Sequence, residues 1–567
     1  MIPVRCGIIA CAAMAMLIAS VPALAQIPGS ELPGRERERF QEPVAPLSQP
    51  AGPRISLPST IAPPGADKVI LTLSRVIVLG STVYRPQDFD PLYSDLIGRT
   101  VTLQDVYDIA ARITAKYGAD GYVLSRAVVP PQELSPQGAV VRIQIIEGYV
   151  DRVEWPAALS RYFDFFSYYA DKIIADRPAN IRTLERYLLL AGDLPGLKFK
   201  NSLKPSASNP AAATLVVEVV EKPIDALARV DNRGTKARGP LEYYGSATLN
   251  NMLRIHDAFT VTYASVPRTR ELQYLYGQYR QVLTPEGLTA FVDGSVSGGH
   301  PGTRALELLD YRTKSSLLEA GLSYPFIRQR ERNLSATALF FASNDRSDIL
   351  SAINTDDHLR GVRVRLDADA ADPWGGINQL NLIGSHGLRA LGAAASGLTI
   401  RPDAPLDFSK FEATFTRLQA LPAQFSLLFA AYGQYALDPL FIPEQCGYGG
   451  RVFGRAYDPS QIVSDSCVEL LGELRWDVPL GIKYLSQTQL YGYADRGWLH
   501  NRNLASVLGT AGTSATVDAA SVGGGLRLGL QSPFTTFGAL TADLSANKAF
   551  EGPRDDWRFF FIVAARY

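Results

Sequence analysis

Polar and apolar residues alternate along short stretches from residue 225 to the C-terminus, with Gly-, Asp-, Asn- and Pro-rich turns between the stretches. In residues 361–370, for example, Val362 and Val364 alternate with Arg363 and Arg365. Successive side chains of a β-strand point to opposite faces, so this period of two predicts strands with one apolar and one polar face. We therefore predict a large antiparallel sheet over this part of the chain.

Two features of this sheet favour a transmembrane β-barrel over a soluble β-sandwich, whose strands alternate in the same way. Many strands have about ten residues, the length that a tilted strand needs to cross a bilayer. Aromatic residues also lie on or near strand ends, as in the interfacial girdles of membrane barrels; they include Tyr274, Tyr276, Phe411, Phe415, Trp557 and Phe559. At about 21 residues per strand and turn, residues 224–567 accommodate about 16 antiparallel strands. A barrel of that width has a lumen wide enough for water or a peptide.

Two compact α/β modules precede the barrel, at residues 67–149 and 150–223. In the first, Thr102 and Asp105 have the spacing of a helix capping box, and the helix that follows carries an apolar stripe. The stripe consists of Val106, Ile109, Ala110, Ile113 and Tyr117. In the second module we expect two helices, over residues 162–174 and 181–191, before a closing strand. Both modules thus share the order strand, helix, strand, strand.

The N-terminus has the pattern of a secretory signal peptide over residues 1–25. Arg5 precedes an apolar run, and Ala23-Leu24-Ala25 forms a small-residue cleavage site. The run is short for a membrane anchor and ends in Pro22, which favours cleavage over anchoring. We therefore expect the mature chain to be exported.

Residues 26–66 are rich in Pro, Gly, Ser and Ala, a composition typical of a mobile tether. A charged island at residues 34–41 interrupts the tether, and it could form a short helix with little apolar face. No later run of about 18 apolar residues follows, so we expect no transmembrane helix.

The composition argues against several other classes of function. The 567 residues contain 56 Lys and Arg and 56 Asp and Glu, a balance without the basic excess of a nucleic-acid-binding protein. The five His residues are scattered without the spacing of a metal site, and no nucleotide-binding or nucleophile-elbow motif is present. We therefore predict a protein that is not an enzyme, uses no metal ion or other cofactor and binds no nucleic acid.

Cys446 and Cys467 are the two cysteines that remain after residues 1–25 are removed. They flank a Gly- and Arg-rich loop in what we expect to be an oxidising compartment, which favours a disulfide that closes this loop. Two buried thiols are the alternative.

Several motifs give the modules and the barrel a family resemblance. In the first module they are Val78-Leu79-Gly80, Gly98-Arg99-Thr100, Gly121-Tyr122, Gln132 and Ile146-Glu147-Gly148; in the second, Gly192-Asp193-Leu194-Pro195-Gly196; and at the start of the barrel, Asp231-Asn232-Arg233-Gly234. With signal, tether, modules and barrel in this order, the chain resembles the two-partner secretion transporters of TpsB type. These are the haemolysin and filamentous-haemagglutinin secretion proteins of the Omp85 superfamily.

The resemblance implies a transmembrane β-barrel of about 16 antiparallel strands preceded by two periplasmic α/β POTRA domains. The domains would divide the chain into a signal peptide (1–25), an N-terminal plug helix and linker (26–66), POTRA domain 1 (67–149), POTRA domain 2 (150–223) and the barrel (224–567). The charged island then corresponds in position to a helix that plugs the lumen in relatives, although an ordinary linker is the alternative.

The most specific motif of the resemblance is Gly454-Arg455-Ala456-Tyr457, which aligns with the superfamily's Val-Arg-Gly-Tyr or Val-Arg-Gly-Phe. The resemblance implies that this loop folds back into the lumen and that Arg455 pairs with an acidic residue of the barrel wall. Asp495 is the partner that we predict, because it shares the polar face of its strand with Gln487 and Gln489. Ala456 stands where the family usually has Gly, which accepts backbone conformations that Ala does not.

The last strand resembles the C-terminal signal that the barrel-assembly machinery reads. Phe559, Phe561, Val563 and Tyr567 share one face of it. Biogenesis of the barrel would therefore involve that machinery and outer-membrane lipid.

The resemblance implies a translocator in the outer membrane of a Gram-negative bacterium, with its POTRA domains in the periplasm. It would recognise and secrete one large, β-rich partner exoprotein of the adhesin, haemolysin or haem-binding type. A barrel-insertion factor of the same superfamily is the first alternative, but such factors usually carry more POTRA domains. A general outer-membrane pore is the second alternative, and it would need no POTRA domain.

Overall fold

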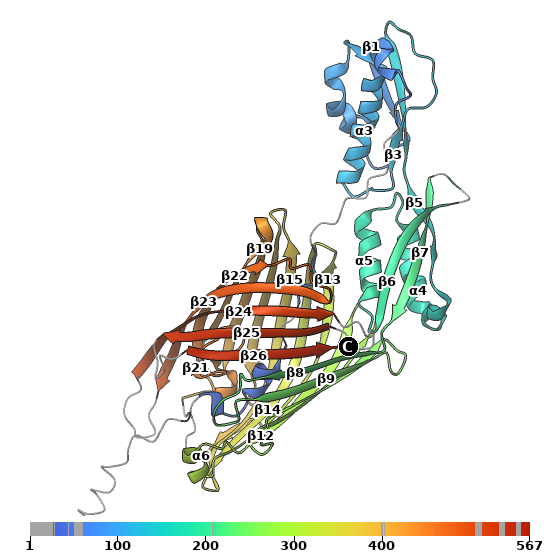
Figure 1. Cartoon of the computed structure of the whole chain (residues 1–567). Helices are drawn as coiled ribbons and strands as arrows, with labels where there is room; N and C mark the ends of the chain where they lie inside the picture. Colours follow the sequence, from blue (N-terminus) through green and yellow to red (C-terminus); the bar gives the residue numbers. More distant parts are fainter. Residues whose placement is uncertain are drawn as a thin grey trace, which may run out of the picture.

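The computed structural model describes residues 27, 29–42, 45–49, 61–206, 209, 211–397, 401, 403–504, 513–531, 539–550 and 557–567. The predicted signal peptide (1–25) lies outside the described residues. Figure 1 shows two small α/β domains stacked at one end of a large β-barrel. We call this end of the barrel the domain end and the opposite end the far end.

Within the described residues, sixteen antiparallel strands close the barrel, the number that the sequence predicted. They are β8 (Ile224–Asp231), β9 (Glu242–Asn250), β10 (Asp257–Ser265), β11 (Gln273–Val282), β12 (Thr289–Gly299), β13 (Arg312–Arg328), β14 (Arg332–Ile349), β15 (Ala352–Ala371), β16 (Gly376–Gly387), β18 (Ser409–Ala420), β19 (Phe425–Ala436), β22 (Ser466–Asp477), β23 (Leu485–Leu504), β24 (Thr513–Gln531), β25 (Ala539–Phe550) and β26 (Trp557–Arg566). The short β17 (Ala394–Ser396) adds to β15, and β20 (Cys446–Tyr448) pairs with β21 (Ile462–Ser464) as a separate hairpin. The last strand, β26, pairs with the first, β8, so the barrel has no free edge.

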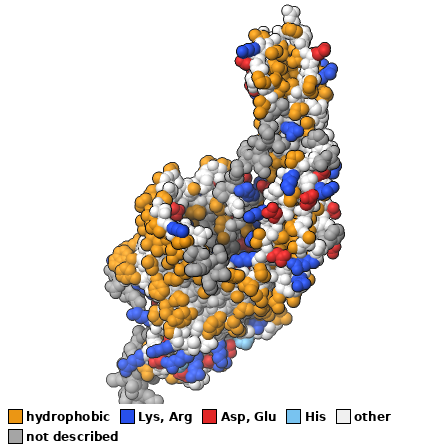
Figure 2. All heavy atoms as spheres, turned by 45° about the vertical axis from the view of Figure 1, so that its right-hand side comes forward, with side chains coloured by type: hydrophobic (Ala, Val, Ile, Leu, Met, Phe, Trp, Pro, Cys, Tyr) orange, Lys and Arg blue, Asp and Glu red, His pale blue; other side chains and the backbone are white. Residues whose placement is uncertain are grey.

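The predicted alternation places apolar residues outside and charged residues inside. Val362, Val364 and Leu366 of β15 are 43%, 54% and 42% exposed on the outer wall. Arg363 between them points into the lumen, where its guanidinium pairs with Glu319 at 3.0 Å. Figure 2 shows the resulting hydrophobic surface on the outer wall of the barrel. The predicted inside and outside faces of this strand are therefore confirmed.

Several strands are longer than the roughly ten residues that the sequence predicted. β13, β14, β15, β23 and β24 contain 17 to 20 residues each. At the far end their pairing continues past the apolar part of the outer wall, and Arg346 of β14 contacts Asp348 at 2.7 Å there. Charged pairs of this kind are compatible with water but not with a bilayer core, so the extra length lies beyond the membrane.

The first α/β domain has a four-stranded sheet in the order β2-β1-β4-β3, which comprises β1 (Ile70–Leu79), β2 (Thr100–Thr102), β3 (Arg126–Val128) and β4 (Ala139–Ile146). Its helix α3 (Leu103–Ala119) begins as predicted, since the Thr102 hydroxyl accepts from the Asp105 N–H and Asp105 accepts from the Thr102 N–H. The five residues of the predicted stripe are the buried residues of α3 and pack against the sheet.

The second α/β domain shares three strands of this arrangement, but it has no counterpart of β2 and has two helices instead of one. Its sheet, β5-β7-β6, comprises β5 (Tyr149–Glu154), β6 (Leu197–Pro205) and β7 (Ala212–Glu221), and α4 (Phe163–Ala175) and α5 (Ile181–Gly192) cover it. In both domains the first strand runs parallel to the last, and the strand before the last pairs antiparallel with it. Apart from β2 in the first domain and the second helix in the second, both domains follow the predicted order of strand, helix, strand, strand.

A cluster of hydrogen bonds joins the second domain to the domain end of the barrel. Glu286, in the turn between β11 and β12, accepts from Arg186 (2.7 Å), Tyr168 (2.8 Å) and Tyr187 (3.0 Å) of α4 and α5. Burial alone would raise the pKa of Glu286, but these three donors outweigh it and lower the pKa below its ordinary value. The charged form of Glu286 therefore holds the joint together.

Asp193 and Arg328 form a second ionic contact across the same joint. The Arg328 guanidinium, at the end of β13, donates two hydrogen bonds to the Asp193 carboxylate, at 2.6 and 2.8 Å. This paired geometry fixes direction as well as distance. The second domain therefore has a defined orientation on the barrel.

Within the described part of the chain, no helix is both long and apolar enough to cross a membrane.

Glu286→Gln should loosen the second domain on the barrel, because the Arg186 guanidinium loses its charged partner. We expect broader spin-label distance distributions between α5 and the barrel in the variant at neutral pH. In the unaltered chain the same broadening should appear as the pH falls through the lowered pKa of Glu286, and it should be absent above about pH 4.5. Glu331→Gln, in the exposed turn before β14, is the matched control. A distribution as narrow as that of the control would contradict the role of Glu286.

Candidate functional site

A short helix, α2 (Glu36–Phe40), lies inside the barrel and contacts its wall through charged side chains. Arg37 pairs with Asp293 of β12 at 3.1 Å and with Glu319 of β13 at 2.7 Å. Arg39 pairs with Glu242 of β9. The basic residues of the charged island thus contact acidic residues of the lumen wall.

The acidic residues of the same segment contact basic residues of the far-end loops and wall. Glu36 of α2 and Glu31 of the preceding turn share Arg238, each at 3.0 Å, and Arg238 is only 1% exposed. Glu42 pairs with Arg229 and, at 3.0 Å, with Arg451. The charged island contains basic and acidic residues in turn, and the lumen offers each kind a partner of the opposite charge.

The apolar contribution to the seating of α2 is small. Phe40 is the buried apolar residue of the helix, and its ring lies 5.2 Å from that of Tyr274. The seating of α2 therefore depends mainly on ion pairs and hydrogen bonds.

The long loop between β19 and β22, residues 437–465, also folds into the lumen and carries Arg455. The guanidinium of Arg455 forms an ion pair with Glu473 of β22 and lies 4.7 Å from the centre of the Tyr493 ring. Arg233 donates to the carbonyl oxygens of Gly450 and Arg455 at 3.0 Å, which holds the same loop from the far end. The loop tip is thus fixed against the wall on two sides.

The structure corrects the predicted partner of Arg455, which is Glu473 and not Asp495. Asp495 accepts hydrogen bonds from the Arg455 backbone N–H (3.3 Å), from the Ser521 hydroxyl (2.8 Å) and from the Tyr448 hydroxyl. Both carboxylates lie on lumen faces, but the Arg455 backbone already lies level with Asp495. Its long side chain extends past Tyr493, which is directly opposite Glu473 in the neighbouring strand.

Glu473 had a sequence signal of its own, because it falls on the polar face of an alternating stretch with Glu469 and Arg475. The structure shows why this position is the anchor. The Glu473 side chain has no exposed surface and pairs with Arg475 at 2.6 Å and Arg527 at 2.8 Å, in addition to Arg455. One carboxylate therefore holds three guanidinium groups that would otherwise repel one another.

Gly454, rather than residue 456, is the position of the motif that needs glycine. Its φ is +62°, and a Cβ there would lie 2.7 Å from the Gly449 backbone nitrogen. Ala456 has no such positive φ and is buried without strain. The Tyr457 hydroxyl donates to the Phe550 carbonyl at 2.7 Å, so the whole motif contacts the wall.

A disulfide joins Cys446 of β20 to Cys467 of β22. It connects the in-folded loop covalently to the barrel wall at the far end. The loop can therefore move around this point but cannot separate from it while the disulfide is intact.

The last strand presents its apolar face outward. Phe559 and Tyr567 are 74% and 55% exposed, and Phe561 and Val563 lie on the same face. Phe560, on the opposite face, is 6% exposed in the lumen, where Arg233 lies 4.3 Å from its ring. The four residues of the predicted assembly signal thus face the surroundings of the barrel.

Among the described residues, no group of three or more His, Cys, Asp or Glu side chains is placed to hold a metal ion. The charged groups of the lumen are engaged with one another instead. The geometry therefore describes a barrel with an apolar outer wall, in whose lumen a helix and a loop are seated by polar contacts.

Comparisons with known proteins agree with this architecture. Residues 71–148 match the POTRA domain of ShlB type, and residues 214–519 match the family described as haemolysin secretion/activation protein ShlB/FhaC/HecB. The chain is 24% identical to the outer membrane transporter CdiB of Escherichia coli over 473 residues, which cover 79% of this chain and 76% of CdiB. It is 25% identical over 245 residues to the heme/hemopexin transporter protein HuxB of Haemophilus influenzae, 42% of each chain.

Solved structures show the same fold. The structure of CdiB from Escherichia coli superposes with a TM-score of 0.67 and 20% identity, covering 90% of this chain and 94% of that one. CdiB from Acinetobacter baumannii superposes with a TM-score of 0.57 and 14% identity, covering 94% and 95%.

The fold together with the family match defines an outer-membrane transporter of two-partner secretion, with its POTRA region in the periplasm. The chain belongs to the ShlB/FhaC/HecB family of haemolysin secretion/activation proteins, because the family match extends over more than half of its length. The resemblance, the fold class, the location and the secretion function that the sequence predicted are confirmed, and secretion is favoured over barrel insertion. Members of this family secrete partner exoproteins. The domain end of the barrel is therefore periplasmic and the far end extracellular.

Glu473→Gln should destabilise the barrel and release its loop, because three guanidinium groups lose their shared carboxylate. Removing one partner of a buried ion pair costs about 3–5 kcal/mol. We expect a lower thermal unfolding temperature and faster cleavage of residues 437–465 by protease added from outside. Glu307→Gln is the control, since it breaks an exposed pair with Arg270 that contributes about 0–1 kcal/mol. Similar unfolding temperatures for the two variants would show that Glu473 is not the anchor.

Proposed function

We propose that this protein exports one large, β-rich exoprotein in an unfolded state through its own lumen, and that α2 and the loop of residues 437–465 keep the lumen closed at rest. The observation that supports this most directly is the polar seating of α2. A helix held by apolar packing would be difficult to remove, whereas ion pairs can be exchanged for contacts with water and with a passing peptide.

The segment that carries the helix is anchored to the β8–β13 side of the barrel wall and to the in-folded loop. The basic side chains of the helix contact β9, β12 and β13, and the acidic side chains of its segment contact Arg229, Arg238 and Arg451. Because Arg451 belongs to the in-folded loop, release of the helix would also remove one contact of that loop. We therefore propose that the helix and the loop open in a coupled way.

The periplasmic domains would capture the partner before transport. β6 is an edge strand of the second α/β domain, and its nine residues pair with β7 on one side only within the described chain. An extended segment of the exoprotein could add to this edge and extend the sheet. Lys198, Lys200 and Lys204 lie along β6, as is typical of edges protected against self-pairing, and they favour an acidic or polar segment.

The kind of exoprotein is an open choice among an adhesin, a haemolysin and a haem-binding protein. The relatives are of both kinds, a CdiB transporter and a heme/hemopexin transporter.

We also propose that Phe559, Phe561, Val563 and Tyr567 form the signal for the barrel-assembly machinery. Their outward position supports this role, because an assembly factor and lipid approach from outside.

The experiment that tests the proposed function compares the proteins released by cells with and without this transporter, by quantitative mass spectrometry. We expect one large exoprotein to disappear from the medium while the other outer-membrane proteins keep their amounts. A decrease in many outer-membrane barrels instead would contradict a dedicated exporter and favour an insertion factor. An unchanged medium and an unchanged membrane would contradict both.

Arg238→Gln tests whether polar contacts keep the lumen closed. The change leaves Glu31 and Glu36 without their shared cation, and a loss of about 1.4 kcal/mol would raise the population of open barrels about tenfold. We expect more frequent and larger openings of single proteins in planar bilayers. Arg312→Gln is the control, since Arg312 makes an exposed pair with Asp310 at the same end, outside the lumen. Currents equal to those of the control would contradict the closing role of the helix.

A further inference from the structure

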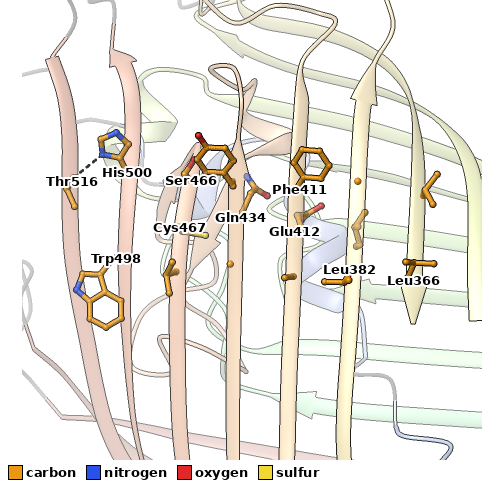
Figure 3. A pocket seen from close by; sticks show the side chains of 17 residues that line it. Leu366, Leu382, Phe411, Glu412, Gln434, Ser466, Cys467, Trp498, His500 and Thr516 are labelled. Atoms are coloured by element: carbon orange, nitrogen blue, oxygen red, sulfur yellow. Dashed lines mark hydrogen bonds between the residues drawn. The ribbon is translucent and has the colours of Figure 1, made fainter. Parts of the chain in front are cut away.

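A hollow lies on the outer wall of the barrel, across β15, β16, β18, β19, β22, β23 and β24. The hollow has a volume of about 800 Å³, and Figure 3 shows it with the lining side chains on these neighbouring strands. It lies within the apolar surface that faces the bilayer, and we call it the wall groove. Its volume falls in the range of about 300–1,000 Å³ that is usual for sites of small ligands.

The floor of the wall groove is made of small residues. Gly384, Ala413 and Gly433 occupy outward-facing positions of their strands, and Ala413 is directly opposite Gly433 in the pairing of β18 and β19. A Cβ added to Gly433 would have its nearest neighbour at 3.8 Å, and one added to Gly384 at 3.6 Å. Neither glycine is therefore required by close packing inside the protein. The small residues therefore leave an open space on the outer surface.

Large side chains surround this floor. Phe411 and Tyr435 lie on the extracellular side of it and are 58% and 56% exposed, and Trp498 lies beside it on β23. Aromatic rings around an apolar floor produce a slot that is narrower than the open wall. A flexible apolar chain fits such a slot better than a rigid or polar molecule does.

The extracellular rim of the wall groove carries a cation. The Arg502 guanidinium lies 5.4 Å from the centre of the Tyr435 ring and donates one hydrogen bond to the Leu437 carbonyl at 2.8 Å. Among the residues that the structure describes, no carboxylate forms an ion pair with this guanidinium. Asp465, which accepts from the Arg502 backbone N–H, is already held by both terminal nitrogens of Arg401.

Neutral polar groups complete the rim. His500 and Thr516 share a hydrogen bond of 3.0 Å, which Figure 3 shows, and His386 and Ser409 share one of 2.9 Å. These pairs lie toward the extracellular ends of their strands, where the bilayer core gives way to headgroups. The rim is thus polar and positively charged, while the floor is apolar.

We propose that the wall groove is a binding site for one acyl chain of an outer-leaflet lipid, whose phosphate group contacts Arg502. Two observations select this occupant. The groove is continuous with the surface that faces the bilayer, so acyl chains are the molecules that reach it. The Arg502 guanidinium at its extracellular rim, which pairs with no carboxylate of the described residues, is complementary to a phosphate, and Arg can bind phosphate oxygens with two parallel hydrogen bonds.

The proposal predicts a lipid that copurifies with the protein and depends on the space above Gly433. The full-length protein is extracted from outer membranes in a mild detergent, and bound lipid is measured by native mass spectrometry and by lipid extraction. We expect one phosphate-bearing outer-leaflet lipid for each molecule of unaltered protein. Gly433→Leu fills the floor and should reduce this lipid about tenfold, the factor that a loss of about 1.4 kcal/mol gives.

Two further variants separate the site from general effects on the barrel. Gly277→Leu places the same side chain on the outer face of β11, where a Cβ meets nothing within 4 Å, and should leave the bound lipid unchanged. Arg502→Gln keeps the floor and should reduce the phosphate-bearing lipid while a lipid with an uncharged headgroup is still retained. This second variant provides a test even if Gly433→Leu does not fold.

Several results would overturn the proposal. The first is an equal amount of bound lipid in the Gly433→Leu and Gly277→Leu proteins. The second is an inner-leaflet phospholipid as the bound species, and the third is an unchanged amount of the phosphate-bearing lipid in Arg502→Gln. The fourth is loss of the lipid from the unaltered protein on exchange into fresh detergent.

Discussion

The charges that line the lumen must find partners, because the barrel removes them from bulk water while its wall separates them from the lipid. Much of the interior of this protein is organised by that constraint. Arg363 of β15 and Lys410 of β18 both pair with Glu444 of the in-folded loop, and Arg238 pairs with the segment that carries α2. Ion pairs therefore join the wall, the loop and the segment that carries α2 into one network.

This balance has a mechanical consequence. Apolar packing would offer nothing to a polar chain, whereas water or a polar chain that enters the lumen can replace the partners of these charged groups as the ion pairs separate. Phe40 is the one apolar side chain that α2 buries. The apolar contacts of the protein lie elsewhere, on the outer wall and in the cores of the two α/β domains, and the joint at Glu286 holds the second domain to the barrel. Movement in the lumen can thus occur while the frame stays intact.

The predictions that succeeded from sequence are those in which neighbouring residues carry the information. The period of two around Val362 and Arg363 assigned the two faces of β15, and the Thr102–Asp105 capping box marked the start of α3. The partner of Arg455 was predicted wrongly, as Asp495 instead of Glu473. Both residues lie on polar faces of adjacent strands, and the choice between them depends on how far the loop descends into the lumen. The strand lengths were also underestimated, because β14 and β15 continue into water beyond the bilayer.

By itself the sequence determined the secondary structure, the inward and outward faces of the strands, the order of the domains and the class of transporter, because hydrophobic period, capping and motif are local properties of the chain. Only the tertiary structure decided which charges meet. Arg238 is about 200 residues from Glu36, and Arg455 reaches Glu473 only after the loop has turned back through the lumen. A single sequence lists the charges of both signs but not the distances between them, and the pairing energy of a charge depends on distance. The wall groove arises in the same way, since Gly384, Ala413 and Gly433 become neighbours only when β16, β18 and β19 lie side by side.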